Sequence, residues 1–190
     1  MVDLHQVAPG LPDTHPWMSY SRWGMVWRAW LGVVITAMIG SVAASLVIWG
    51  GPNPMLMFAI TLVGILPVIC GALAAVLGPW LRRFYPFSQS LIFAGITTGV
   101  VWILLATVSI AESILRGPCP PDVLCLDPLN GLYWGVILFG LPAFLFPCIG
   151  FGLANWAPTP KGQKWFWPVA AGAIIVFGTF LAFGLLQNGL

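Results

Sequence analysis

Long apolar stretches separated by short polar segments dominate the pattern of this chain. A helix that crosses a membrane needs about 20 mainly apolar residues. Stretches of about that length occur at Leu31 to Trp49, Met55 to Leu77, Leu91 to Ala111, Leu132 to Trp156, and Trp165 to Leu186. We therefore predict an all-α polytopic membrane protein with five transmembrane helices. Residues 31–190 form the bundle, with an external loop at 113–131, and residues 1–30 form a cytoplasmic tail and a short interfacial helix.

Four aromatic residues precede the first apolar stretch at helical spacing, and these predict the interfacial helix. Tyr20, Trp23, Trp27 and Trp30 follow one another at intervals of three, four and three residues. That spacing places the four rings on one face of a helix. Because aromatic rings favour the headgroup level, we expect this face to anchor the chain at the membrane surface. A docking face for a partner is the alternative.

Composition changes the picture by excluding whole classes of protein. Of the 190 residues, 59% are hydrophobic and only 6% are charged, against about 25% charged residues in soluble domains. This composition excludes a water-soluble fold. The seven basic and five acidic side chains are too few to form the basic surface that nucleic-acid binding requires. We therefore expect the lipid bilayer and other membrane subunits as partners, and no nucleic acid.

The basic residues predict the orientation of the chain. Six of the seven fall in segments that share one side of the membrane: Arg22, Arg28, Arg82, Arg83, Lys161 and Lys164. Only Arg116 falls on the opposite side. The positive-inside rule then places the N-terminus in the cytoplasm and the C-terminus outside, in a membrane of the bacterial inner-membrane type.

The external loop contains two of the four cysteines. Cys119 and Cys125 lie on the side predicted to be oxidising, so we expect a disulfide between them. A metal site formed by both thiolates and Asp122 is the alternative, but it lacks a histidine and the usual ligand spacing. Cys70 and Cys148 lie inside predicted spans, where a thiol usually behaves as a small apolar residue.

Small residues and prolines mark the expected contacts and bends of the helices. In lipid, helices associate closely where glycine lets the backbones approach. We expect such packing at Gly40, Gly71, Gly95, Gly99, Gly131, Gly135 and Gly178. The pattern does not distinguish packing within the chain from docking to another subunit. Each of Pro67, Pro142 and Pro147 lies within a span and is expected to kink its helix.

A single acidic side chain approaches the membrane interior. Glu112 lies at the external end of the third span, four residues before Arg116, and this spacing predicts an ion pair at the interface. A carboxylate that gates a proton or binds a cation is the alternative. Such a path needs further charged groups inside the spans, and the sequence supplies only threonines there.

Catalytic and cofactor-binding patterns are missing from the sequence. No histidine follows His15, which excludes haem held by histidine within the spans. The chain also lacks a CxxC motif and any Ser-His, paired-carboxylate or HExxH arrangement. We expect no catalytic residue, no metal ligand and no side-chain ligand for a cofactor. A membrane enzyme that shares its active site with a partner, through Glu112 and Asp122, is the weakest alternative.

The leading hypothesis is therefore a non-catalytic structural or accessory subunit of a larger membrane complex. A respiratory or photosynthetic electron-transfer complex fits the aromatic, glycine-rich and charge-poor composition, with lipid, quinone or pigment held at the contacts. The alternative is a channel or carrier for a neutral or apolar small solute, formed by the kinked second and fourth spans.

Overall fold

A bundle of long helices makes up the computed structural model, which describes residues 22–49, 56–81, 83–116, 133, 135–157 and 159–187. The elements are α1 (Arg22–Trp49), α2 (Leu56–Leu81), α3 (Pro86–Arg116), the π-helical turn η3 (Val136–Gly140), α5 (Leu141–Trp156) and α6 (Pro160–Gln187). Within these ranges, five helices are long and apolar enough to cross a membrane. The predicted all-α multi-pass fold is confirmed.

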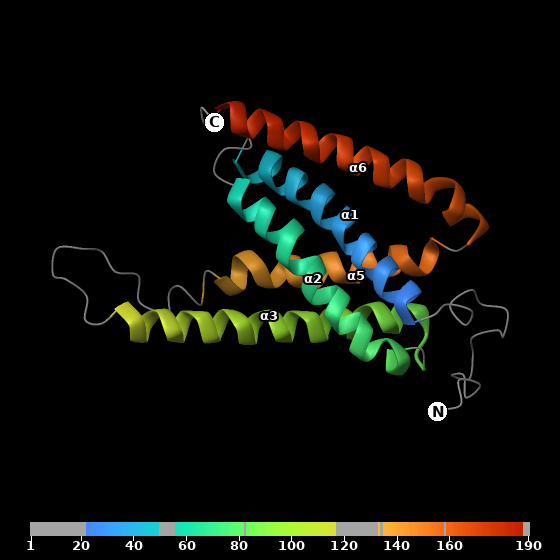
Figure 1. Cartoon of the computed structure of the whole chain (residues 1–190), viewed down its shortest axis with the longest axis horizontal. Helices are drawn as coiled ribbons and strands as arrows, with labels where there is room; N and C mark the ends of the chain where they lie inside the picture. The colour runs from blue at the N-terminus through green and yellow to red at the C-terminus, as the bar shows by residue number, and fades with distance from the viewer. Residues whose placement is uncertain are drawn as a thin grey trace.

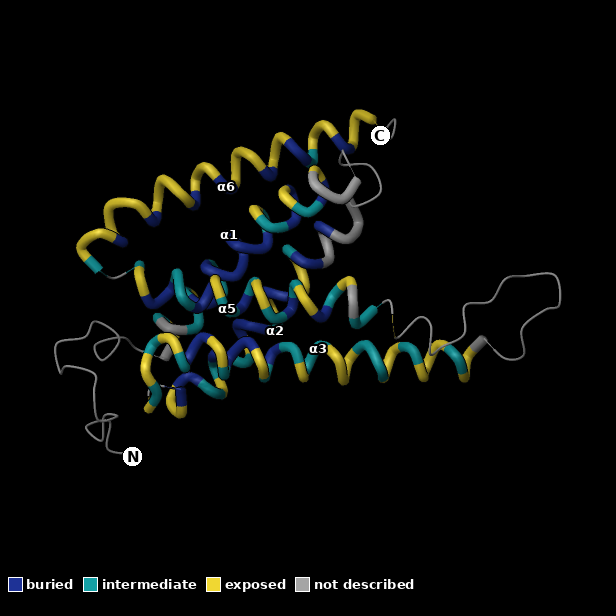
Figure 2. Tube along the Cα trace, turned by 180° about the vertical axis from the view of Figure 1, so that it is seen from behind, coloured by how far each residue is buried: buried dark blue, intermediate teal, exposed yellow. Residues whose placement is uncertain are grey.

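Helix α1 lies at the centre of the bundle and packs against α2, α5 and α6. Helix α3 packs mainly along α5, so α3 and α6 lie on opposite sides of the molecule (Figure 1). Burial follows this arrangement: 56% of the apolar window of α1 is buried, against 22% for α3 and 28% for α6. Figure 2 shows the same gradient, with α1 mostly buried and α6 mostly exposed. The outer two helices therefore present long apolar faces to their surroundings.

A close contact between two helix backbones joins α1 to α5. A Cβ added to Gly32 would meet the Gly150 carbonyl oxygen, and one added to Gly150 would lie 2.7 Å from the Val33 nitrogen. One turn further along α1, the Thr36 hydroxyl donates to the Phe146 carbonyl at 3.0 Å. The two backbones approach closely here because neither helix carries a side chain at the crossing point.

Helix α1 differs from the prediction of a separate interfacial helix. It runs without interruption from Arg22 to Trp49, so the aromatic segment forms its first turns. No proline occurs between Arg22 and Trp49 to interrupt the helix. A single helix also keeps the backbone hydrogen bonds inside the segment. Trp23, Trp27 and Trp30 lie in the first turns of this long helix. Tyr20 lies outside the described residues.

The fourth span begins with a change in helical winding. The π-helical turn η3 ends at Gly140, and α5 follows at once with Pro142 in its first turn. Proline has no N–H to donate, so a regular helical ladder cannot pass through Pro142 unchanged. By contrast, α2 continues through Pro67, which is fully buried. Pro147 lies inside α5 and is also buried.

A capped turn connects α5 to α6. The Thr159 hydroxyl accepts a hydrogen bond from the Gly162 N–H at 3.0 Å and donates to the Trp156 carbonyl at 2.8 Å. Pro160 then occupies the first position of α6, where a missing N–H costs nothing. A Cβ on Gly162 would meet the Trp156 carbonyl oxygen, so the turn needs glycine there.

Removal of this cap is the first testable consequence. Thr159→Ala is expected to lower the free energy of unfolding by about 1 kcal/mol, because the Gly162 N–H loses its acceptor. Thr179→Ala is the matched control, since the exposed Thr179 hydroxyl only donates to the Ile175 carbonyl of its own helix. Thermal unfolding in detergent measures both. Equal melting temperatures for the two variants would show that the cap contributes nothing.

Candidate functional site

An apolar groove of about 330 Å³ lies where α2, α3 and the start of α5 diverge. Every residue that lines it is hydrophobic: Leu62, Ile65, Leu66, Ile69, Val101, Leu104, Leu105, Val108, Phe139 and Ala143. Helices α2 and α3 make few contacts with each other although they are consecutive along the chain. The groove occupies the space between these two helices and is large enough to hold a small molecule.

The two walls of the groove carry the same sequence spacing. The α2 wall is formed by positions 62, 65, 66 and 69, and the α3 wall by positions 101, 104, 105 and 108. Both sets follow the i, i+3, i+4, i+7 pattern of a single helical face. Two continuous apolar stripes therefore face each other across the groove.

Two of the prolines that were predicted to kink their helices, Pro67 and Pro142, lie beside this groove. Phe139 from the π-helical turn and Ala143 from the first turn of α5 line it, and both flank Pro142. Pro67 lies between two α2 lining residues, Leu66 and Ile69. Trp102 of α3 also approaches the π-helical turn, since a Cβ on Gly140 would lie 2.8 Å from its indole nitrogen. The irregular start of α5 therefore packs against α3 beside the groove.

Two threonine hydroxyls of α3 donate hydrogen bonds within their own helix. Thr97 and Thr98 donate to the carbonyls of Phe93 and Ala94, each at 2.8 Å. The buried Cys70 thiol lies in hydrogen-bond contact with the Thr97 hydroxyl. Cys70 and Cys148 are free thiols, and Cys70 belongs to the apolar core. This arrangement fits a packing role for Cys70.

The glycines expected at helix contacts have different environments. Gly40 faces the Phe146 ring, Gly71 faces Trp30, and Gly135 faces Leu105. These three lie at contacts between helices of this chain. Nothing lies within 4 Å of a Cβ added to Gly95, Gly99 or Gly178. Those three do not pack within the described part of the chain, because their helix faces point outward; Gly131 lies outside it.

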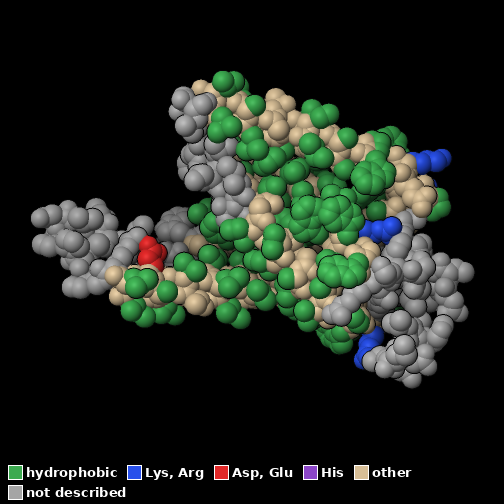
Figure 3. All heavy atoms as spheres, viewed as in Figure 1, with side chains coloured by type: hydrophobic (Ala, Val, Ile, Leu, Met, Phe, Trp, Pro, Cys, Tyr) green, Lys and Arg blue, Asp and Glu red, His purple; other side chains and the backbone are tan. Residues whose placement is uncertain are grey.

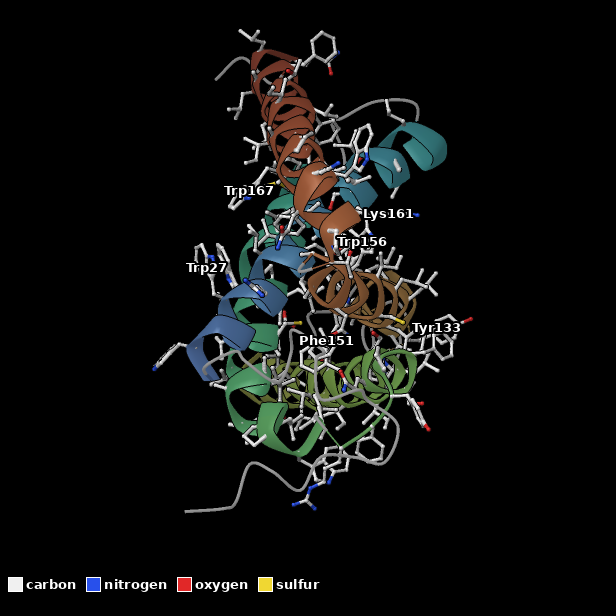
Figure 4. All side chains as sticks on the ribbon, turned by 90° about the vertical axis from the view of Figure 1, so that its right-hand side faces the viewer. Trp27, Tyr133, Phe151, Trp156, Lys161 and Trp167 are labelled. Carbon is white, nitrogen blue, oxygen red and sulfur yellow. The ribbon has the colours of Figure 1, made fainter. Side chains whose placement is uncertain are left out.

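Aromatic side chains gather at one end of the bundle. Trp23 and Trp27 are 77% and 59% exposed, whereas Trp30 is half-buried against Gly71. The Trp27 and Trp30 rings stack with their centroids 5.0 Å apart. In Figure 4, Trp27 from α1 and Trp167 from α6 project outward on the same side of the molecule, while Phe151 lies inside. The exposed rings match the position expected of headgroup-level anchors.

Charge is segregated along the bundle. The described Lys and Arg side chains lie at one end, where α1 and α6 begin, and the acidic side chain lies toward the far end of α3 (Figure 3). Glu112 is exposed in the last turns of α3. The side chain of Arg116 lies outside the described residues, as do Cys119 and Cys125. The ion pair and the disulfide therefore stay predictions.

Sequence reasoning did not single out Asn155, a buried amide near the end of α5. Its side chain is 8% exposed, and neither its nitrogen nor its oxygen has a hydrogen-bond partner. It lies one turn after Phe151, whose ring stacks on Phe93 of α3 at 4.7 Å. The sequence feature that could have identified Asn155 is an amide side chain inside an otherwise apolar helix.

Most substitutions in a protein core lower the free energy of unfolding, but we expect a substitution of Asn155 to raise it. Asn155→Leu is expected to raise the free energy of unfolding by about 1 kcal/mol, because it removes two buried polar atoms that lack partners. Thermal unfolding of the purified variant in detergent tests this. A lower melting temperature would show that the amide has a partner in the membrane.

The arrangement is suited to holding a hydrocarbon chain. Across the described ranges, no group of three His, Cys, Asp or Glu side chains is placed to hold a metal ion. The groove offers van der Waals contact along two helical faces but no hydrogen-bonding side chain. Comparisons of the chain with protein-family models, with curated proteins and with solved structures return no match.

Proposed function

We propose that this protein is a non-catalytic accessory subunit of a larger membrane complex. The observation that carries the proposal is the open face of α3 around Gly95 and Gly99, where nothing lies within 4 Å of an added Cβ. In lipid, a GxxxG face of this kind favours close association with another helix. Gly178 on α6 is open in the same way, so both outer helices are able to meet partner subunits.

The apolar groove supports the second part of this proposal. A site lined only by hydrophobic residues suits the tail of a lipid, a quinone or a pigment. A respiratory or photosynthetic electron-transfer complex contains such molecules at subunit contacts and remains our proposed setting. The subunit would supply packing surface and a tail site, while other chains carry out the chemistry.

Native-gel electrophoresis of the protein extracted in mild detergent tests the subunit proposal. We expect migration in a large complex whose other chains mass spectrometry then identifies. Gly95→Leu is expected to weaken this association, and Gly64→Leu is its matched control, because Gly64 is also open but lies on α2. Migration of the wild-type protein as a monomer would contradict the proposal.

The second candidate function is a carrier for an apolar small solute. The observation that favours it is the position of the groove between Pro67 of α2 and the π-helical turn before Pro142. Irregular helices of this kind line substrate paths in transporters. Uptake of a neutral apolar solute into liposomes that contain only this protein would favour the carrier. Absence of uptake would favour the accessory-subunit proposal.

We also propose the orientation that the charges indicate. Lys161 and Lys164 lie in the first turns of α6 and Arg83 lies just before α3, and these two helices begin at the same end of the bundle (Figure 1). The positive-inside rule assigns this end to the cytoplasm. Because α6 ends at the opposite end, a reporter fused after Leu190 is expected outside a bacterial-type inner membrane. A cytoplasmic reporter would reverse this assignment.

A further inference from the structure

We propose that the start of α3 and Asn155 of α5 form a site for the headgroup of an anionic phospholipid of the phosphatidylglycerol class. The site lies at the end of the bundle where α1, α3 and α6 begin (Figure 1). The lipid phosphate meets the first backbone N–H groups of α3, and the Asn155 amide meets a phosphate oxygen and a headgroup hydroxyl. Neither part of the site lines the apolar groove, so this inference is independent of the proposed function.

The Asn155 side chain faces α3. In α5, the Phe151 ring stacks on Phe93 of α3 with centroids 4.7 Å apart. A Cβ on Gly152 would lie 3.9 Å from the hydroxyl oxygen of Ser90, also in α3. Asn155 follows Phe151 by four residues and Gly152 by three, so it lies on the same helix face, one turn further along.

The opposite directions of α3 and α5 set the level of Asn155 in the bundle. A Cβ on Gly140 would approach Trp102 of α3. One on Gly152, further along α5, would approach Ser90, which lies earlier in α3. Positions after Gly152 therefore meet the residues before Ser90, where α3 begins. Asn155 is thus level with the first turn of α3.

The Asn155 amide calls for a ligand that offers both an acceptor and a donor. The side chain is more than nine-tenths buried, and neither its nitrogen nor its oxygen has a hydrogen-bond partner. A primary amide donates through its nitrogen and accepts through its oxygen. A phosphodiester whose alcohol carries a free hydroxyl, as in phosphatidylglycerol, provides a phosphate oxygen for the nitrogen and a hydroxyl for the oxygen.

The first turn of α3 favours the negative charge of a phosphate. The hydrogen-bond ladder of α3 starts with the Gln89 N–H, which donates to the Tyr85 carbonyl at 2.8 Å. The N–H groups of Phe87 and Ser88 precede it, so the helix supplies no carbonyl for them. Such groups form the positive end of the helix dipole and bind phosphate oxygens. Arg83, just before α3, is exposed and adds a full positive charge.

The site lies at the depth of lipid headgroups. Trp156, next to Asn155, is exposed, and so is Trp80 near the end of α2. Exposed tryptophans at the ends of spans mark the interface between membrane and water. The Arg83 N–H donates to the Trp80 carbonyl at 3.2 Å, which places the start of α3 at the same level. Figure 4 looks onto this end of the bundle.

Native mass spectrometry of the purified full chain, freed of bound lipid, tests the site. The probes are phosphatidylglycerol and phosphatidylethanolamine with identical acyl chains at equal concentration. We expect retention of phosphatidylglycerol to exceed that of phosphatidylethanolamine roughly fivefold, as one basic side chain near the surface allows. Equal retention of the two lipids would overturn the inference.

Asn155→Leu is expected to reduce retention of phosphatidylglycerol roughly tenfold, because the amide no longer donates to the charged phosphate. Without lipid this variant is expected to be at least as stable as the wild type, so the loss does not reflect unfolding. Gln187→Leu, at an exposed amide in the last turn of α6, is the matched control and should leave retention unchanged. Retention that Asn155→Leu does not change would contradict the site.

A second pair of variants separates a built site from the general charge of this end. Arg83→Gln is expected to bring the ratio of the two lipids close to one. Lys164→Gln removes another exposed basic side chain, in the first turns of α6, and should preserve most of the preference. An equal loss in both variants would show that surface charge alone holds the lipid, and the site at α3 would fail.

Free phosphate is the other source of the same chemistry. Sodium phosphate, added at constant ionic strength to the complex with phosphatidylglycerol, is expected to leave the lipid bound, because the acyl chains add contacts that phosphate lacks. Displacement of the lipid by an equal concentration of phosphate would overturn the assignment to a membrane lipid.

Discussion

Gly32→Leu is expected to separate α1 from α5 and to lower the free energy of unfolding by roughly 3 kcal/mol, at the upper end of overpacking effects. The physical reason is that the added side chain would meet backbone. A Cβ on Gly32 collides with the Gly150 carbonyl, and the Gly32 carbonyl carbon lies 2.8 Å from a Cβ on Gly150. Backbone cannot rotate away as a flexible side chain can, so the two helices must move apart.

Gly64→Leu provides the control for this experiment, because nothing lies within 4 Å of a Cβ at Gly64. Its thermal unfolding in detergent is expected to stay near that of the wild type. Glycine is intrinsically unfavourable inside a helix, by roughly 1 kcal/mol relative to alanine, so any change at Gly64 should be a small stabilisation. Equal destabilisation of both variants would show that the close α1–α5 crossing is not the cause of the loss at Gly32.

Phe151→Ala is expected to be the second large loss, roughly 3 kcal/mol, because it opens a cavity in the core. Phe151 is 1% exposed and its ring stacks on the fully buried Phe93. Four helices contribute residues to the surrounding apolar cluster. The lost ring contacts are not replaced from outside, since the Phe151 side chain is buried among other core residues.

The matched substitution for Phe151→Ala is Phe183→Ala on α6, where the side chain is 55% exposed. Lipid or detergent chains replace its contacts, so we expect little change in the melting temperature. Tryptophan fluorescence during heating reports on both variants. A loss at Phe183 as large as that at Phe151 would mean that α6 is covered by another chain in the purified protein.

The helices themselves could be predicted from the sequence because their signal is local. A stretch of about 20 apolar residues has few alternatives to a spanning helix. The boundaries were less accurate: α1 begins at Arg22 and not at Leu31, and α3 extends from Pro86 to Arg116. Aromatic and small polar residues continue these helices beyond the hydrocarbon region, where hydropathy alone does not detect them.

The contacts between helices could not be predicted in the same way. Gly40 and Gly95 have similar sequence surroundings, yet Gly40 faces the Phe146 ring and Gly95 faces outward. The difference depends on how each helix is rotated in the bundle, which small-residue spacing does not encode. Gly32 and Gly150 form a close backbone approach but were not among the expected contacts. The groove was missed for the same reason, because it exists only once α2 and α3 diverge.

The α1–α5 contact also has a consequence for the order in which the protein is made. The Thr36 hydroxyl and the Phe146 carbonyl that it meets are separated by 110 residues. At a synthesis rate of about 5–20 residues per second, the second partner follows the first by roughly 5 to 20 seconds. During that delay, α1 is in the membrane while its glycine face has no helix to receive it. The nascent chain therefore passes through a stage in which α2 can already pack against α1, while the α5-facing side of α1 is covered by lipid or by the insertion machinery.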